Sequence, residues 1–148
     1  DGLEGPLAAE RAIVANAKKI ALFTSGAASQ KYLQALADQQ EVMGALADIL
    51  IETFVMESAL LRTQKLVEHG GEKAAALPIA MTQVYVTEAM DRIEAAAKKV
   101  IAAVAEGDML RTQMAIVRRL VKYEPFNTVA LRQQVATKVI EAGKYVTA

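Results

Sequence analysis

The feature that most constrains this chain is a long series of regularly spaced apolar residues. Between Val86 and Val104 the apolar side chains recur at alternating intervals of four and three residues, which places them along one side of an α-helix. The composition agrees, because 29 of the 148 residues are Ala, only 3 are Pro, and aromatic residues make up 5%. Such a mixture favours helices and disfavours strands. The sequence therefore predicts an all-α fold, with a central stripe of Val86, Met90, Ile93, Ala97, Val100 and Val104.

Two further helices are predicted before this one. The first begins near Pro6 and continues to about Ala37. The second covers residues 42–67 and ends at Gly70-Gly71, because glycine adopts the left-handed conformation at a helix C-terminus without steric cost. This second helix carries two apolar rows, so we expect it to lie centrally in the fold. Its second row is Met43, Leu50, Phe54 and Leu61.

The remaining helix boundaries are marked by proline, glycine and capping residues. The third helix either starts near Pro78 or is kinked there. We expect Gly107 to close the third helix and Asp108 to cap the fourth, and Asn127 to cap a fifth helix that runs toward Gly143. All 148 residues are therefore predicted to form a single domain, an up-and-down helical bundle with three long and two shorter helices.

The residue types exclude several kinds of catalysis. The chain has no Cys and a single His, which removes disulfides, thiolate metal sites and thiol nucleophiles. We interpret His69 as a structural residue at a helix C-terminus, where the helix dipole favours a cation. No nucleophile elbow, P-loop or dinucleotide-binding glycine pattern is present. We therefore assign no catalytic and no cofactor-binding residue within this chain.

Two pairs of acidic residues are candidate metal ligands. Asp48 with Glu52, and Glu88 with Asp91, share helix faces and offer the oxygen ligands that hard cations prefer. Because imidazole ligands are lacking, we interpret both pairs as solvated helix faces and assign no metal ligand, although a metal-binding bundle stays an alternative.

Helical spacing also predicts two ion pairs along the third helix. Glu88 with Arg92, and Glu94 with Lys98, stand four residues apart in the favourable order.

Charge is unevenly distributed along the chain. The net charge is zero, yet residues 108–148 carry 7 basic and 3 acidic side chains. A solvated bundle face explains this cluster, but a basic amphipathic helix also binds anionic membranes or acidic partners. Few aromatic residues lie nearby, so we do not expect a nucleic-acid partner. The longest uncharged stretch, residues 74–87, is too short to span a bilayer. The candidate interaction surface consists of Arg111, Arg118, Arg119 and Lys122.

Three segments together resemble a known family. They are FVMESALLRT at residues 54–63, EGDMLR at 106–111 and KYEPFN at 122–127. These segments, and the opening Asp1-Gly2-Leu3, resemble the additional C-terminal helical domain of bacterial acyl-CoA dehydrogenases, which are most similar to the very-long-chain type. The resemblance covers essentially the whole chain.

This resemblance implies a parent flavoenzyme that introduces an α,β double bond into a fatty acyl-CoA during fatty acid oxidation. A Glu base removes the α-proton and FAD accepts the β-hydride, but those residues belong to the preceding domains, and none is transferred to this chain. Here Glu57 is expected to be structural, pairing with Arg62 or with another helix. FAD is therefore expected only in the parent enzyme, and the chain alone is expected to be inactive.

The resemblance also implies partners. In related enzymes the added bundle covers part of the dehydrogenase body, and both dimeric assembly and membrane association are attached to this region. We expect a cytoplasmic homo-oligomer, with the basic segment available to an anionic membrane surface. The alternative is a free-standing helical interaction module or peripheral membrane adaptor. The start at Asp1, without an initiator Met, favours a piece of a larger protein.

Overall fold

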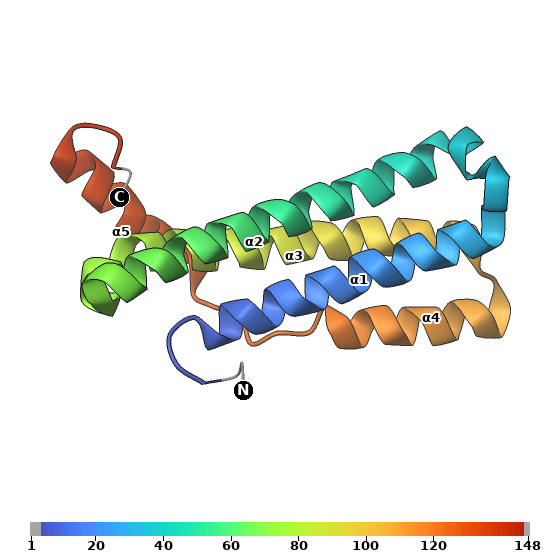
Figure 1. The fold of residues 1–148 in the computed structure, drawn as a ribbon, viewed down its shortest axis with the longest axis horizontal. Coiled ribbons are helices and arrows are strands. Elements are labelled where there is room, and N and C mark those ends of the chain that lie inside the picture. The colour runs from blue at the N-terminus through green and yellow to red at the C-terminus, as the bar shows by residue number, and fades with distance from the viewer. Residues whose placement is uncertain (1–3, 147–148) are drawn as a thin grey trace.

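The computed structural model describes residues 4–146 as a bundle of helices (Figure 1). Helices α1 to α4 lie side by side, and successive helices run in opposite directions, while α5 lies at the end of the bundle where α2 ends and α3 begins. The all-α fold with three long and two shorter helices is thus confirmed for the described residues. In chain order the elements are α1 (Ala8–Tyr32), the short 3-10 helix η1 (Leu33–Asp38), α2 (Gln40–Ala74), α3 (Ala76–Val104), α4 (Gly107–Leu120) and α5 (Thr128–Ala142).

The central helix is α3, which contacts α1, α2, α4 and α5. Its predicted stripe from Val86 to Val100 is buried, with every member at most 1% exposed, and Val104 is partly buried. The prediction that the second helix lies centrally is wrong. Among the described elements, helix α2 packs only against α1, η1 and α3, so its second apolar row points to solvent. The exposed fractions in that row are 41% for Met43, 53% for Leu50, 71% for Phe54 and 51% for Leu61.

Helix α1 is shorter than predicted. It ends at Tyr32 rather than near Ala37, because Leu33 has a φ angle of 49° that an α-helix cannot accommodate. The chain then forms the 3-10 helix η1 before turning into α2. The Tyr32 hydroxyl donates a hydrogen bond to the carbonyl of Ala103 over 3.2 Å, which ties the end of α1 to the end of α3.

The connection between α2 and α3 follows the prediction. Gly71 interrupts the helix with φ 80° and ψ 165°, a conformation that is open to glycine and strained for other residues. One further turn leads to Ala74, and α3 begins at Ala76. Pro78 therefore lies in the first turn of α3, where its missing N–H breaks no helical hydrogen bond.

The connection between α3 and α4 differs from the prediction. Glu106, in an extended conformation, is the residue before α4, and Gly107, with φ 56°, is the first residue of that helix. Asp108 therefore lies inside the first turn, where its carboxylate pairs with Arg111, and the prediction that Asp108 caps α4 is wrong. By contrast, the Asn127 cap of α5 is confirmed, because its side-chain oxygen accepts the N–H of Ala130 at 3.0 Å.

Candidate functional site

Three residues of the predicted basic surface lie on the side of α4 that faces away from the bundle, and the fourth, Lys122, follows the end of this helix. Arg111, Arg118, Arg119 and Lys122 are all exposed, whereas Val117 on the inner side is fully buried. Arg111 is paired with Asp108 of its own helix. The other three cations form no ion pair among residues 4–146. The structure thus leaves these three side chains accessible to an anionic partner.

Three of the four acidic candidates for metal ligands, Glu52 among them, bond to side chains from other parts of the fold, and Asp48 is exposed. Glu88 pairs with Arg132 of α5, and Asp91 accepts the Tyr123 hydroxyl over 2.9 Å. Among the described residues no group of three or more His, Cys, Asp or Glu side chains is placed to hold a metal ion. The predicted pair of Glu88 with Arg92 is wrong, because Arg92 reaches across to α2. The pair of Glu94 with Lys98 is confirmed at 2.8 Å.

A polar cluster of Glu52, Arg92 and Tyr85 joins α2 to α3. Arg92 donates Nε to Glu52 Oε1 at 2.7 Å and Nη2 to Oε2 at 3.0 Å, a bidentate arrangement with fixed geometry. The Tyr85 hydroxyl donates to Oε2 at 2.9 Å, and the guanidinium lies 5.7 Å from the centre of the Tyr85 ring. Each of the three residues therefore bonds to another member of the cluster, which fits a structural role.

The cluster shifts the pKa values of its members in consistent directions. The hydrogen bonds from Arg92 hold the pKa of Glu52 below its ordinary value of 4.5, although partial burial opposes this shift. Burial, followed by the hydrogen bond to Glu52, raises the pKa of Tyr85. At Tyr123, burial and the hydrogen bond to Asp91 raise the pKa to about 12. Each shift favours the protonation state in which the residue makes its hydrogen bond.

Two further residues singled out from the sequence are structural. Glu57 pairs with Lys18 of α1, which confirms the expected interhelical partner. His69 is exposed near the end of α2, and its Nδ1 lies 2.6 Å from the Lys65 carbonyl oxygen in the preceding turn. This contact within α2 agrees with the interpretation of His69 as a structural residue near the end of the helix.

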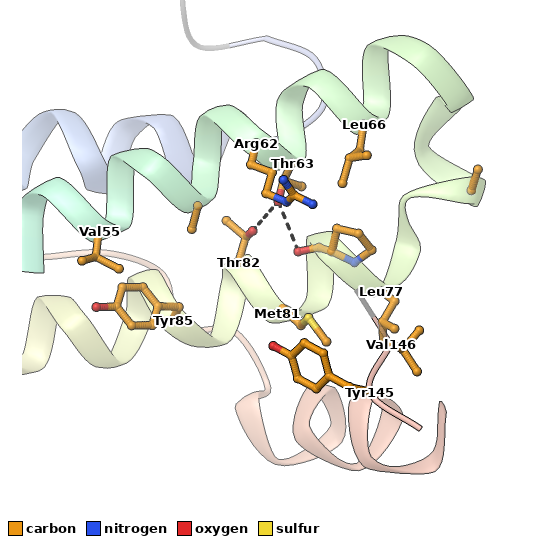
Figure 2. A pocket seen from close by; sticks show the side chains of 13 residues that line it. Val55, Arg62, Thr63, Leu66, Leu77, Met81, Thr82, Tyr85, Tyr145 and Val146 are labelled. Carbon is orange, nitrogen blue, oxygen red and sulfur yellow. Dashed lines mark hydrogen bonds between the residues drawn. The ribbon is translucent and has the colours of Figure 1, made fainter. Parts of the chain in front are cut away.

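A groove of about 590 Å³ lies between the C-terminal half of α2 and the N-terminal half of α3 (Figure 2). Figure 2 shows Leu66 and Met81 beside it, and Tyr145, which follows α5, on the side away from α2. Its lining is mainly apolar, with Arg62 at the α2 side. The apolar lining residues are Val55, Ala59, Leu66, Ala74, Leu77, Pro78, Met81 and Val146.

The buried hydroxyls in the groove are already bonded. Thr63 and Thr82 are 4% and 3% exposed, and their hydroxyl oxygens lie 2.7 Å apart. The Thr63 hydroxyl also lies 3.5 Å from the Pro78 carbonyl oxygen. Because these hydroxyls are hydrogen-bonded to each other, they need no hydrogen-bond partner from a ligand. The groove therefore suits apolar groups.

No sequence pattern predicts the polar contacts between helices. Glu10 is 3% exposed and accepts the Gln83 amide at 2.7 Å, although these residues are 73 positions apart. The Glu52 and Thr63 contacts also depend on the register between α2 and α3. The spacing of the outward apolar row of α2 is visible in the sequence, but spacing alone does not show whether another helix covers that face.

Among residues 4–146 no helix has the length and hydropathy needed to cross a membrane.

Comparison with known proteins relates the whole chain to one group. The sequence model of the family described as acyl-CoA dehydrogenase, C-terminal domain, matches residues 16–119. A probable acyl-CoA dehydrogenase of Bacillus subtilis is 41% identical over 141 residues, which cover 95% of this chain and 24% of that protein. The crystal structure of an acyl-CoA dehydrogenase complexed with FAD from Bacillus anthracis has a TM-score of 0.96 and 37% identity, covering 99% of this chain and 25% of the other. The chain thus spans about a quarter of the length of these relatives.

Proposed function

This chain belongs to the family of acyl-CoA dehydrogenase C-terminal domains, and on that premise we propose that it is the non-catalytic helical domain of a larger FAD-dependent acyl-CoA dehydrogenase. One observation carries the proposal. Nearly the whole chain has the same fold as one quarter of a dehydrogenase that binds FAD. The parent enzyme would oxidise a fatty acyl-CoA to the α,β-unsaturated product. Bound FAD would supply the hydride acceptor for that reaction.

The described residues do not fit an FAD site of their own. The groove between α2 and α3 is lined mainly by apolar side chains, and its buried threonine hydroxyls bond each other. A flavin dinucleotide carries a charged pyrophosphate that requires donors such as the N–H groups of a glycine-rich turn. We therefore assign the flavin and the catalytic base to the three quarters of the parent that lie outside this chain.

Within the parent, we propose that the groove and the adjoining α5 face the dehydrogenase body. No residue of α5 is buried, and Val129 and Ile140 are 67% and 79% exposed. Exposed apolar surface of this extent is typical of a face that another part of the protein covers. The function of the bundle would then be to support the assembly of the parent rather than to perform chemistry.

The natural gene product tests this proposal. An antibody against this chain should capture, from the source cells, a protein of about four times its 15.9 kDa mass, with the absorbance of bound flavin and acyl-CoA oxidising activity. The isolated chain, titrated with FAD, should show no stoichiometric binding. Capture of a 16-kDa protein without flavin, or tight FAD binding by the isolated chain, would contradict the proposal.

A second candidate function rests on the basic surface of α4. We propose peripheral contact of a cytoplasmic enzyme with an anionic membrane, supported by Arg118, Arg119 and Lys122, which have no acidic partner among the described residues. Because most of the apolar face of α4 packs against the bundle, such contact would be mainly electrostatic and weakened by salt.

Co-sedimentation with vesicles containing phosphatidylserine, at low salt, tests this second function. Arg118→Glu with Arg119→Glu should abolish binding. A matched control, Lys19→Glu with Lys31→Glu, changes the charge by the same amount at exposed positions of α1 and should retain most of it. Absence of binding by the unmodified chain, or equal loss in both variants, would overturn membrane contact through α4.

A further inference from the structure

Helix α5 lies outside the core that holds the other helices together. Among the described elements it contacts only α3, and none of its residues is buried. No described residue of α5 belongs to the hydrophobic core or packs against it, whereas Tyr123 and Phe126 of the preceding connection do pack against it. The connection is therefore anchored to the bundle, and α5 is attached beyond that anchor.

The contact between α5 and α3 is loosely packed. A cavity of about 350 Å³ lies between the two helices, beside Val84 and Val135. The inner side of α5 consists of Thr128, Leu131, Val135 and Val139, which are only partly buried. Dispersion contacts are lost wherever a void lies between two surfaces. Apolar packing therefore holds α5 less firmly than it holds α1, α2 and α3 together.

An exposed ion pair joins α5 to the bundle. Arg132 donates Nε to Glu88 Oε1 at 3.1 Å and Nη2 to the same oxygen. The side chains of Arg132 and Glu88 are 60% and 36% exposed, and ion pairs of such exposure are weak because solvent screens them. Helix α5 can therefore separate from α3 with a much smaller free energy than unfolding of the bundle requires.

The connection before α5 provides the joint for such a separation. Residues 122–127 form no helix, and the Tyr123 hydroxyl holds this connection in place by donating to Asp91 at 2.9 Å. Helix α5 has 15 residues, and an isolated helix of that length is only marginally stable in water. Separation from α3 would therefore open the hydrogen bonds of the whole helix at once.

Separation of α5 would also change the surface of α3. Met81 and Tyr85 line both the groove beside α2 and the cavity beneath α5. Tyr145, which follows α5, lines the same groove (Figure 2). Movement of α5 and the residues after it away from α3 would join the groove and the cavity into one apolar surface.

We propose that residues 128–146, which we call the α5 strap, open from α3 as one unit while α1 to α4 stay folded, and that this opening uncovers the apolar surface around Met81. The proposal goes beyond the proposed function, which assigns no movement to α5. Antibody capture and FAD titration do not depend on this movement, so a failure of the strap and a failure of the proposed function are distinguishable.

Hydrogen–deuterium exchange of the unmodified chain tests the opening. The amides of residues 132–142 should share one protection factor, roughly 100-fold or more below that of the buried stripe of α3. Arg132→Ala should lower the shared value by a further 2- to 5-fold, roughly the effect of an exposed ion pair. Lys138→Ala is the matched control, because it removes an exposed pair with Glu141 inside α5, and it should leave the value nearly unchanged.

Three results of the exchange experiment would overturn the proposal. Protection of α5 equal to that of α3 would mean that α5 opens only when the bundle unfolds. Protection that decreases gradually toward residue 142 would indicate fraying from one end. Equal effects of Arg132→Ala and Lys138→Ala would mean that the contact with α3 does not limit the opening.

Thiol labelling tests the uncovering of α3, since the chain has no Cys of its own. Val84 is partly buried and lines the cavity beneath α5. Labelling of Val84→Cys should be accelerated by Arg132→Ala by the same factor as amide exchange in α5. Labelling of Leu50→Cys, at a position of α2 that is 53% exposed, should not respond to Arg132→Ala. An unchanged rate at position 84 would overturn the role of the α5 strap as a cover.

Discussion

Helices α2 and α3 have similar apolar spacing, but α3 lies at the centre of the bundle and α2 has one apolar face exposed. In α3 the stripe around Met90 and Ile93 is buried among four neighbouring elements. In α2 one apolar row, which includes Ile49 and Met56, is fully buried, whereas the row through Phe54 faces solvent. The comparison teaches that helical spacing identifies apolar faces without saying which of them the chain covers itself. An uncovered face at the edge of a bundle indicates a partner.

The largest expected effect is on the free energy of unfolding, which should fall much more for a substitution in the buried stripe of α3 than for one in the exposed row of α2. Ile93→Ala should lower the free energy of unfolding by roughly 2–5 kcal/mol, because it leaves a cavity at a fully buried position. Phe54→Ala in the monomeric chain should change it by about 0.5 kcal/mol or less, since the ring is 71% exposed. Urea denaturation of both variants below the concentration of association provides the measurement. Similar losses would contradict the difference in burial.

A second prediction concerns the hydrogen bond that joins the two helices at the groove. Thr82→Val should cost roughly 1–3 kcal/mol, because it leaves the buried Thr63 hydroxyl with only its 3.5 Å contact to the Pro78 carbonyl oxygen. The double variant with Thr63→Val should be closer to the unmodified chain, since no buried hydroxyl then lacks its partner. Additive losses in a double-mutant cycle would show that the two hydroxyls are not coupled.

The smallest of these effects is expected at the polar cluster. Glu52→Gln should lower stability at pH 7 by about 1 kcal/mol or less, because Arg92 is half exposed and solvent screens the pair. The folded-state pKa of Glu52 lies below its ordinary 4.5, so its stabilising effect is present above that pH and is lost as the pH falls through the folded-state value.

The difference between the unmodified chain and Glu52→Gln should therefore shrink as the pH falls from about 5 toward 3. Urea denaturation across this range measures it. A difference that stays constant with pH would show that the carboxylate charge contributes nothing to the contact between α2 and α3.

Most of the fold was predictable because its signals are local. The α3 stripe, the glycine break at Gly71 and the Asn127 cap each depend on residues within a few positions of one another. Asp108 was misassigned because its carboxylate can either cap a helix or pair with a residue one turn on, and Arg111 stands at that spacing. The end of α1 at Leu33 has no local signal of this kind.

The candidate surfaces were only partly predictable. The basic residues of α4 were identified correctly as exposed, since a charged row opposite an apolar stripe points to solvent. The groove depends on how far α2 and α3 diverge and on where Tyr145 returns, which no local pattern encodes. The outward row of α2 was seen in the sequence but assigned to the core, because a second apolar row suits both a central helix and a helix with an external partner.

The measurement that tests this comparison most directly is thiol labelling of single cysteines in the otherwise cysteine-free chain. Phe54→Cys and Val100→Cys place one thiol on the outward face of α2 and one in the buried stripe of α3. In dilute solution the thiol at position 54 should react at nearly the rate of a free thiol, and the thiol at position 100 only as fast as the bundle opens. Equal protection of both positions would contradict the account, because it would mean that the bundle itself covers the α2 face.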